Sequence, residues 1–269
     1  MYIHMIECDC ATDAFEKAFN TVNNYGEIVS SRIGRTKHLT NMTIVINNPR
    51  HNVCINPQRN LSLRYLIGEI NWYMSGSNRV DDIAKYAKMW NDLSDDGETV
   101  NSAYGYRMFH QFGFDQLQYC IDKLRANPYD RQAIIHIKTP SDKPTKDMPC
   151  TCHIQFTCYH GRLEAHTYMR SNDIWLGLPY DIAFFTCLQQ IVAESIGLPC
   201  GKYYHTVGDL HLYEKHWDRR VKYTGDYDMD QRVWNWSDET PESIQNMLDG
   251  GKPKNALLRE LWRVNREKN

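Results

Sequence analysis

Hydrophobic residues recur at helical spacing in three segments of the chain, and these predict three helices: residues 61–74, 115–125 and 181–196. The first carries Glu69 among apolar neighbours, where a buried carboxylate is costly without a task or a partner. Pro128 ends the second helix, because the residue before a proline disfavours helical backbone. The third is predicted to have Asp181 near its N-cap and Gly197 as its stop.

Other segments are rich in β-branched and aromatic residues, which predicts four strands: residues 133–138, 151–159, 163–170 and 203–207. The middle two flank His160 and Gly161 and predict a hairpin. Residues 212–223 predict the start of a further helix. Since strands and helices mix without regular alternation, we expect an α+β fold, a mixed β-sheet packed by helices, in one domain over residues 1–269.

Composition narrows the class of ligand. The 269 residues carry a formal net charge of -2, which argues against non-specific binding to duplex nucleic acid but allows a local arginine cluster around one phosphate. We therefore expect a small nucleotide as ligand, with no nucleic acid polymer required. The N-terminal stretch has no basic segment followed by an apolar one, and no segment reaches the roughly 20 apolar residues of a membrane span. This predicts a cytoplasmic protein with no membrane partner.

The nine cysteines are odd in number and scattered, which is a poor disulfide framework: positions 8, 10, 54, 120, 150, 152, 158, 187 and 200. Most are expected to be reduced and buried. A metal site at Cys150, Cys152 and His153 is disfavoured, because a zinc cytosine deaminase needs His-x-Glu followed by Pro-Cys-x-x-Cys, and both parts are missing. We expect no metal.

Cys150 is better suited to act as a nucleophile. A thiolate that adds to C6 of a pyrimidine makes C5 nucleophilic and so divides one hard step into easier ones. A thiol of pKa about 8.5 is mostly protonated at neutral pH, so it needs a cationic neighbour. Arg170, on the strand paired across the hairpin, is a candidate for that role and for holding a substrate phosphate together with Ser171. Its ordinary alternative is a surface ion pair.

Four motifs carry the functional signal: Pro149-Cys150, Arg170-Ser171-Asn172-Asp173, Leu176-Gly177-Leu178-Pro179-Tyr180-Asp181 and Gly208-Asp209-Leu210-His211-Leu212-Tyr213. In this order and spacing they resemble the thymidylate synthase superfamily, and weaker matches extend the resemblance from about Arg32 to Tyr213. The resemblance implies a thymidylate synthase-like fold, a sheet-to-sheet homodimer and 5,10-methylenetetrahydrofolate as cosubstrate.

The resemblance also implies roles for single residues near the reacting base. Cys150 resembles the nucleophile, and Arg170 and Ser171 resemble its phosphate and thiolate contacts. Glu69 is similar to the glutamate that manages protons and water near C4 of the base, and Tyr104 to an active-site tyrosine.

Further matches surround that centre. His211 and Tyr213 resemble the pair that binds the sugar 3′-hydroxyl, whereas Trp90, Asp173 and Gly177 resemble the folate side of the site. Without the family spacing, Trp90 and Tyr104 are simply core aromatics, and Asp173 is a turn residue.

The arginines of the phosphate site are matched less closely. Arg131 resembles the first of two arginines that the family passes across a dimer interface to the partner's phosphate, but Gln132 replaces the second. Arg32 fits the N-terminal phosphate loop loosely, and Arg35 fits that place equally.

Three departures from the synthase pattern concern specificity. The family reads uracil with an asparagine where this chain has Asp181, and it usually follows the nucleophile with histidine where this chain has Thr151. Its short, apolar-ended tail, which closes the site, is replaced by a strongly charged C-terminus, and a wet site favours hydration over hydride transfer. A carboxyl group at position 181 accepts from the N4 amino group of cytosine and, when protonated, donates to N3.

These observations predict hydroxymethylation of C5 of dCMP, with Cys150 as nucleophile and Asp181 as the reader of cytosine. The alternatives are reductive methylation of dCMP, which yields dihydrofolate, and thymidylate synthesis. From a different class, the chain is a catalytically silent relative that binds nucleotides or RNA. The set of Cys150, Glu69 and Arg170 speaks against that last alternative.

Overall fold

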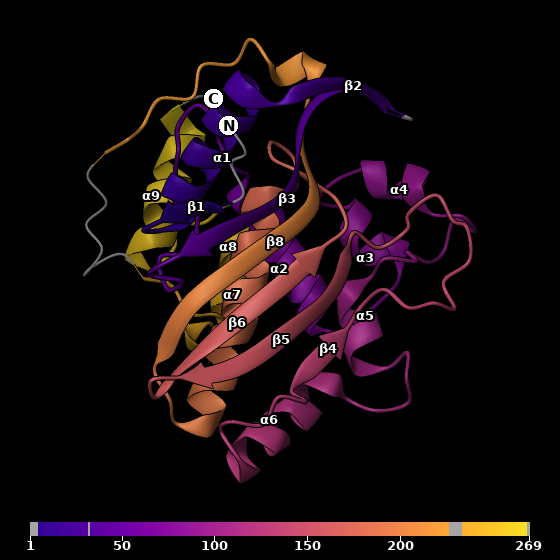
Figure 1. Cartoon of the computed structure of the whole chain (residues 1–269), viewed down its shortest axis with the longest axis vertical. Helices are drawn as coiled ribbons and strands as arrows, with labels where there is room; N and C mark the ends of the chain where they lie inside the picture. The colour runs from indigo at the N-terminus through magenta and orange to yellow at the C-terminus, as the bar shows by residue number, and fades with distance from the viewer. Residues whose placement is uncertain (1–4, 32, 226–232, 268–269) are drawn as a thin grey trace.

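The computed structural model describes residues 5–31, 33–225 and 233–267. One mixed sheet of eight strands organises the fold, in the order β1-β3-β8-β6-β5-β4, with β2 paired to β3 and β7 to β8 (Figure 1). The strands are β1 (Met5–Cys8), β2 (Glu27–Ser31), β3 (Gly34–Ile46), β4 (Ile134–His136), β5 (Thr151–Tyr159), β6 (Arg162–Met169), β7 (Asn172–Asp173) and β8 (Cys200–Tyr213). The predicted α+β class with a mixed sheet is confirmed.

Strand β8 is the centre of the sheet. It runs antiparallel to β3 and parallel to β6, and it also pairs with the short β7. Buried and half-buried residues alternate along β8, so one row of side chains enters the core and the other lies on the opposite face. Because β6 and β7 run parallel to β8, the functional motifs at the C-terminal ends of these strands lie together at one end of the sheet.

The helices gather on one face of the sheet, and α7 (Leu178–Ile196) lies directly behind β6 and β8 in Figure 1. The side chain of Gln189 ties α7 to this face, since its amide donates to backbone carbonyls of Leu163 and Gly201. The other helices are α1 (Ala11–Tyr25), α2 (Leu63–Met74), α3 (Val80–Ala84), α4 (Met89–Leu93), α5 (Tyr104–Phe109), α6 (Gln116–Ala126), α8 (Pro241–Leu248) and α9 (Ala256–Glu267). Figure 1 shows no described helix in front of the other face of β5, β6 and β8.

Local signals set several helix ends. Ser62 accepts a hydrogen bond from the backbone of Tyr65 at the start of α2, as an N-cap residue does. Gly197 ends α7 with φ +71°, in the left-handed region that favours glycine, which confirms its predicted role.

One local prediction was wrong. Residues 212–223 do not begin an α-helix: β8 continues to Tyr213 because β3 pairs with it that far, and only a 3-10 turn, Glu214–His216, follows. The predicted place of Asp181 near the start of the third helix is confirmed, because it lies in the first turn of α7, whose N-cap is Gly177.

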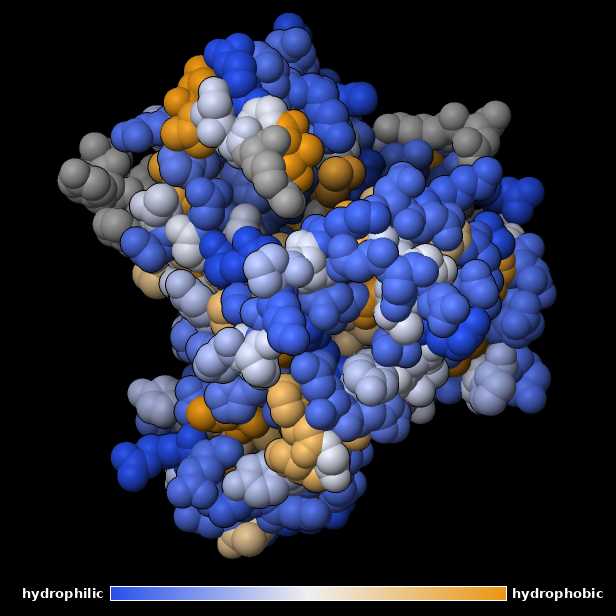
Figure 2. All heavy atoms as spheres, turned by 90° about the vertical axis from the view of Figure 1, so that its right-hand side faces the viewer, coloured by the Kyte–Doolittle hydropathy of each residue, from blue (hydrophilic) through white to orange (hydrophobic). Residues whose placement is uncertain are grey.

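The surface is mainly hydrophilic on the side shown in Figure 2, with hydrophobic residues in scattered patches. Over the ranges that the structure describes, no helix is both long and apolar enough to cross a membrane. The cysteines are all free thiols, and five of them are buried: Cys8, Cys10, Cys54, Cys120 and Cys187.

Candidate active site

A cleft of about 620 Å³ opens where α2, α5, the N-terminus of α7 and the ends of β6 and β8 meet. Most of the residues predicted from the sequence line it: Glu69, Trp90, Tyr104, Cys150, Arg170, Ser171, Asp173, Gly177, Asp181, His211 and Tyr213. Its size lies in the range of small-molecule sites. Arg131 does not line this cleft and is exposed just before β4. The predicted Arg32 lies outside the described residues, and Arg35 forms an ion pair with Glu214.

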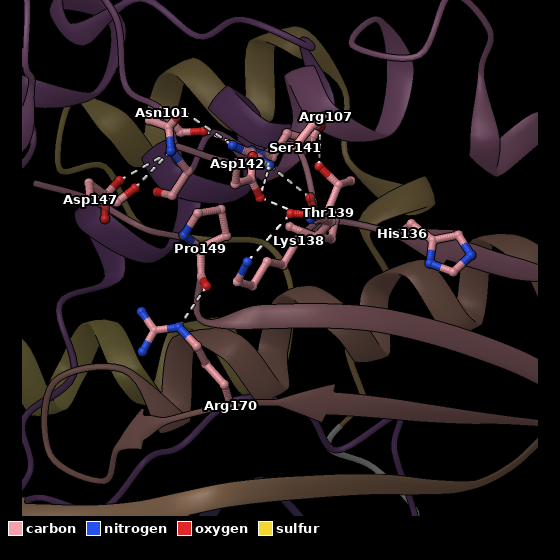
Figure 3. A network of polar contacts seen from close by, with 12 residues as sticks. Asn101, Arg107, His136, Lys138, Thr139, Ser141, Asp142, Asp147, Pro149 and Arg170 are labelled. Atoms are coloured by element: carbon pink, nitrogen blue, oxygen red, sulfur yellow. Dashed lines mark hydrogen bonds and ion pairs between the residues drawn. The ribbon is translucent and has the colours of Figure 1, made fainter. Parts of the chain in front are cut away.

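The backbone around Cys150 is held by Arg170. The amide of Arg170 donates to the Cys150 carbonyl at 2.8 Å. Its guanidinium donates through Nε to the Pro149 carbonyl (3.0 Å) and through Nη2 to that of Met148 (2.9 Å). Figure 3 shows this side chain directed at the segment that leads into β5. Arg170 therefore positions the nucleophile loop, and its Nη1 has no hydrogen bond to any described residue.

A buried arginine anchors the other end of this loop. Arg107 is 2% exposed and pairs with Asp142 at 2.9 Å, while its Nη1 also donates to the Ile137 carbonyl at 2.8 Å. Its Nε donates to the Asn101 carbonyl, and the Asn101 amide in turn donates to the Asp147 carbonyl (Figure 3). Sequence reasoning missed this network, although a basic residue among the apolar positions of α5 was a usable signal.

The thiol of Cys150 is kept neutral in this cleft. Burial raises its pKa to about 11, and the negative charges of Asp181 and Asp147 add to that rise. Arg170 acts in the opposite direction, as expected, but burial outweighs it. The thiol therefore keeps its proton until attack draws it away.

Glu69 lies on α2 at the end of a line of hydrogen bonds. Tyr65 donates to Glu69 Oε1 at 2.6 Å, and Trp90 Nε1 donates to the Tyr65 hydroxyl at 3.1 Å. Burial raises the pKa of Glu69 to about 8, the hydrogen bond from Tyr65 opposes the rise, and the charge of Asp181 adds to it. Trp90 is thus both a cleft residue and a support for this carboxyl group.

Asp181 lines the same cleft as Glu69. Asn172 Nδ2 donates to Asp181 Oδ2 at 2.8 Å. Burial raises the pKa of Asp181 to about 7, against the effect of that hydrogen bond and with the charge of Asp173 adding to the rise. Gly177 leaves room for the pair, because a Cβ there would lie 3.0 Å from Asn172 Nδ2 and 3.1 Å from Asp181 Oδ2.

Tyr104 contributes to the packed wall of the cleft. Its ring stacks on that of Tyr73, with centroids 5.1 Å apart and an interplanar angle of 14°. Helix α5 approaches α2 closely at Gly105, where a Cβ would lie 1.8 Å from the Tyr73 carbonyl oxygen. The glycine is therefore required by close approach.

His211 is held by a carboxylate that sequence reasoning did not single out. Asp209 lies between two rings, with Oδ1 at 3.2 Å from His211 Nδ1 and Oδ2 at 2.8 Å from His38 Nδ1. Burial lowers the pKa of His211, but the hydrogen bond to Asp209 and the charges of Asp173 and Asp209 raise it above the usual value. Because Nδ1 faces Asp209, Nε2 is left for a ligand.

Asp173 has one buried oxygen without a partner among the described residues. Its Oδ1 accepts from the backbone of Trp175 and Leu176, whereas Oδ2 makes no hydrogen bond. A buried polar atom left unpaired is costly, so this oxygen is suited to a ligand donor.

No group of His, Cys, Asp and Glu suited to a metal ion occurs within the described ranges. The family model described as thymidylate synthase matches residues 13–224. The match begins inside α1, earlier than the sequence motifs reached, and continues beyond β8.

Proposed function

Since the chain belongs to the thymidylate synthase family, whose chemistry is one-carbon transfer to C5 of a pyrimidine nucleotide, we propose that it makes 5-hydroxymethyl-dCMP from dCMP. The cosubstrate in this proposal is 5,10-methylenetetrahydrofolate, and water captures the transferred carbon. The observation that carries the proposal is the carboxyl group of Asp181 in the cleft wall, with a pKa raised by burial to about 7.

Asp181 favours cytosine through hydrogen-bond complementarity. Near neutral pH its carboxyl is partly protonated, so one oxygen donates to N3 of cytosine while the other accepts from the N4 amino group. Uracil presents the opposite pattern at both atoms. A mismatched polar pair in a closed site costs on the order of 1 to 3 kcal/mol, which is enough for a strong preference.

The remaining roles follow from the positions of the side chains. Cys150 attacks C6 of the base while its proton passes to the ionised fraction of Glu69 in the same cleft, because burial holds the pKa of the thiol near 11. Glu69, with a pKa of about 8, holds or releases a proton near neutral pH and orders the water that adds to the exocyclic carbon. His211 Nε2 and Tyr213 bind the sugar 3′-hydroxyl, and Arg170 and Ser171 bind the phosphate.

The folate supplies the one-carbon unit when it is bound. The chain offers Asp173, Trp90 and Gly177 on the side of the cleft assigned to it. The buried Oδ2 of Asp173, which has no partner within the described ranges, fits an N–H donor of a pterin ring.

A homodimer completes the proposed site. The uncovered face of β5, β6 and β8 carries half-buried polar and aromatic side chains that alternate with core residues, as suits a second copy of the sheet. In this arrangement the exposed Arg131 reaches the phosphate of the partner's nucleotide.

The test is mass spectrometry of the product formed from dCMP and methylenetetrahydrofolate, with dUMP in a parallel reaction and absorbance followed for dihydrofolate. Hydroxymethyl-dCMP without dihydrofolate is the expected result. Methyl-dCMP with dihydrofolate would make the chain a dCMP methyltransferase, and turnover of dUMP alone would make it a thymidylate synthase.

The variant Asp181→Asn tests the base assignment directly. We expect it to shift activity from dCMP toward dUMP, because an amide donates to O4 and accepts from N3–H of uracil. An unchanged ratio of the two activities would contradict the role of Asp181.

A further inference from the structure

A line of four hydrogen-bonded side chains runs from the cleft wall into the interior. Asn172 Nδ2 lies 2.8 Å from Asp181 Oδ2, and Asn172 Oδ1 lies 2.9 Å from His205 Nε2. His205 Nδ1 lies 2.9 Å from the Tyr203 hydroxyl. Asn172 is 4% exposed, and the two residues behind it are fully buried. Strands β7 and β8 and helix α7 thus each supply part of the line.

The donors in this line all point toward Asp181. An ionised carboxylate only accepts, so Asn172 must present its NH₂ group to Asp181 and its carbonyl oxygen to His205. His205 then donates from Nε2, and its Nδ1 lone pair accepts from Tyr203. Burial lowers the pKa of His205 to about 3, so the ring carries one proton throughout the working pH range.

This direction decides where a proton sits on Asp181. Oδ2 accepts from Asn172, so the carboxyl carries its proton on Oδ1, which has no hydrogen bond to any residue in the described part of the chain. The carboxyl then donates through Oδ1 and accepts through Oδ2, which keeps a second lone pair for a ligand. A donor on Oδ1 and an acceptor on Oδ2 suit N3 and the N4 amino group of cytosine, whereas the reversed arrangement suits uracil.

We propose that Asn172 is a positioning residue that holds Asp181 in the form that reads cytosine, and that His205 and Tyr203 fix the orientation of its amide. The inference rests on the proposed use of Asp181 for base recognition. Gly177 belongs to the same arrangement, since a Cβ there would lie too close to both atoms of the Asn172–Asp181 hydrogen bond.

The experiment compares kcat/KM for dCMP and dUMP in four proteins: the wild type, Asn172→Ala, Tyr203→Phe and the control Thr186→Val. Asn172→Ala is expected to lower the dCMP/dUMP ratio about 10- to 100-fold, as the loss of a buried hydrogen bond allows, mainly through KM. Tyr203→Phe is expected to lower it in the same direction by about 3- to 10-fold. Thr186→Val loses a buried hydroxyl on the same helix, whose hydrogen bonds among the described residues go to the Ile182 and Ala183 carbonyls, and should keep the ratio.

The outcomes separate this inference from the function on which it rests. A wild type that does not prefer dCMP would overturn the proposed function itself. A wild type that prefers dCMP, together with Asn172→Ala and Tyr203→Phe variants of unchanged ratio, would overturn the role of Asn172 alone. If Asn172→Ala does not fold, Tyr203→Phe decides, because it removes only one hydroxyl group.

Discussion

Replacing Glu69 with glutamine is expected to make folding less sensitive to alkaline pH. Burial raises the pKa of this carboxyl from 4.5 to about 8, so the folded protein binds its proton more tightly than the unfolded chain does. The stabilisation from this group is complete below pH 4.5 and is lost as the pH rises through about 8. Glutamine keeps an oxygen that accepts from Tyr65 and does not titrate.

The size of the effect follows from the shift. At ~1.4 kcal/mol per pKa unit, ionising Glu69 in the folded state costs on the order of 5 kcal/mol. About 3 kcal/mol of that falls between pH 6 and pH 9. The wild type should therefore lose about 3 kcal/mol more unfolding free energy over this interval than the Glu69→Gln variant does.

Urea unfolding at pH 6 and pH 9, at one fixed protein concentration, measures this difference. Glu27→Gln is a matched control, because Glu27 is an exposed carboxylate on β2 and its removal should leave the pH dependence of the wild type. Equal losses in the wild type and Glu69→Gln would refute the claim that burial keeps Glu69 protonated. Activity should fall in the same variant, since the proposed proton carrier is gone.

Two further predictions concern the nucleophile and its loop. Alkylation of Cys150 by iodoacetamide, followed by peptide mass spectrometry, should be slow at neutral pH and rise with a midpoint near pH 11, where burial places the pKa of the thiol; a midpoint near 8.5 would contradict this. Arg107→Met should lower the unfolding free energy by about 3 to 5 kcal/mol, because it leaves Asp142 as a buried unpaired charge. The double variant Arg107→Met/Asp142→Leu should recover much of that loss in urea unfolding, and no recovery would place the damage elsewhere.

Sequence patterns predicted what is set locally. The helices around residues 63–74, 116–126 and 178–196 follow from apolar spacing and from capping signals, and the β5–β6 hairpin follows from two strands around a turn. The cleft residues were predicted from the resemblance to the thymidylate synthase superfamily, whose motifs match this chain over short stretches.

What the sequence did not reveal depends on pairing between distant segments. Strand β8 was expected to end at residue 207, yet it runs to Tyr213 because β3, more than 160 residues earlier in the chain, supplies its partner backbone. From the sequence, Asn172 was a motif residue without an assigned role, and His205 was a residue of the strand predicted over 203–207. The hydrogen bonds that link them to Asp181 form because β7 pairs with β8 and the first turn of α7 lies next to β7.

Burial of the ionisable groups in the cleft lowers the stability of the fold, and it also raises their pKa values into a range that suits proton transfer. Cys150, Glu69 and Asp181 all have raised pKa values, with burial as the largest cause of each. In the proposed reaction, protons leave the thiol and C5, and acceptors with pKa values near 7 or 8 are the most effective at neutral pH. Glu69, with a pKa of about 8, meets this need through its ionised fraction, whereas Asp181 keeps its proton for N3 of cytosine and an exposed carboxylate with pKa near 4 would be a weak base. The stability given up at Glu69 and Asp181 is thus the physical condition for their proposed work.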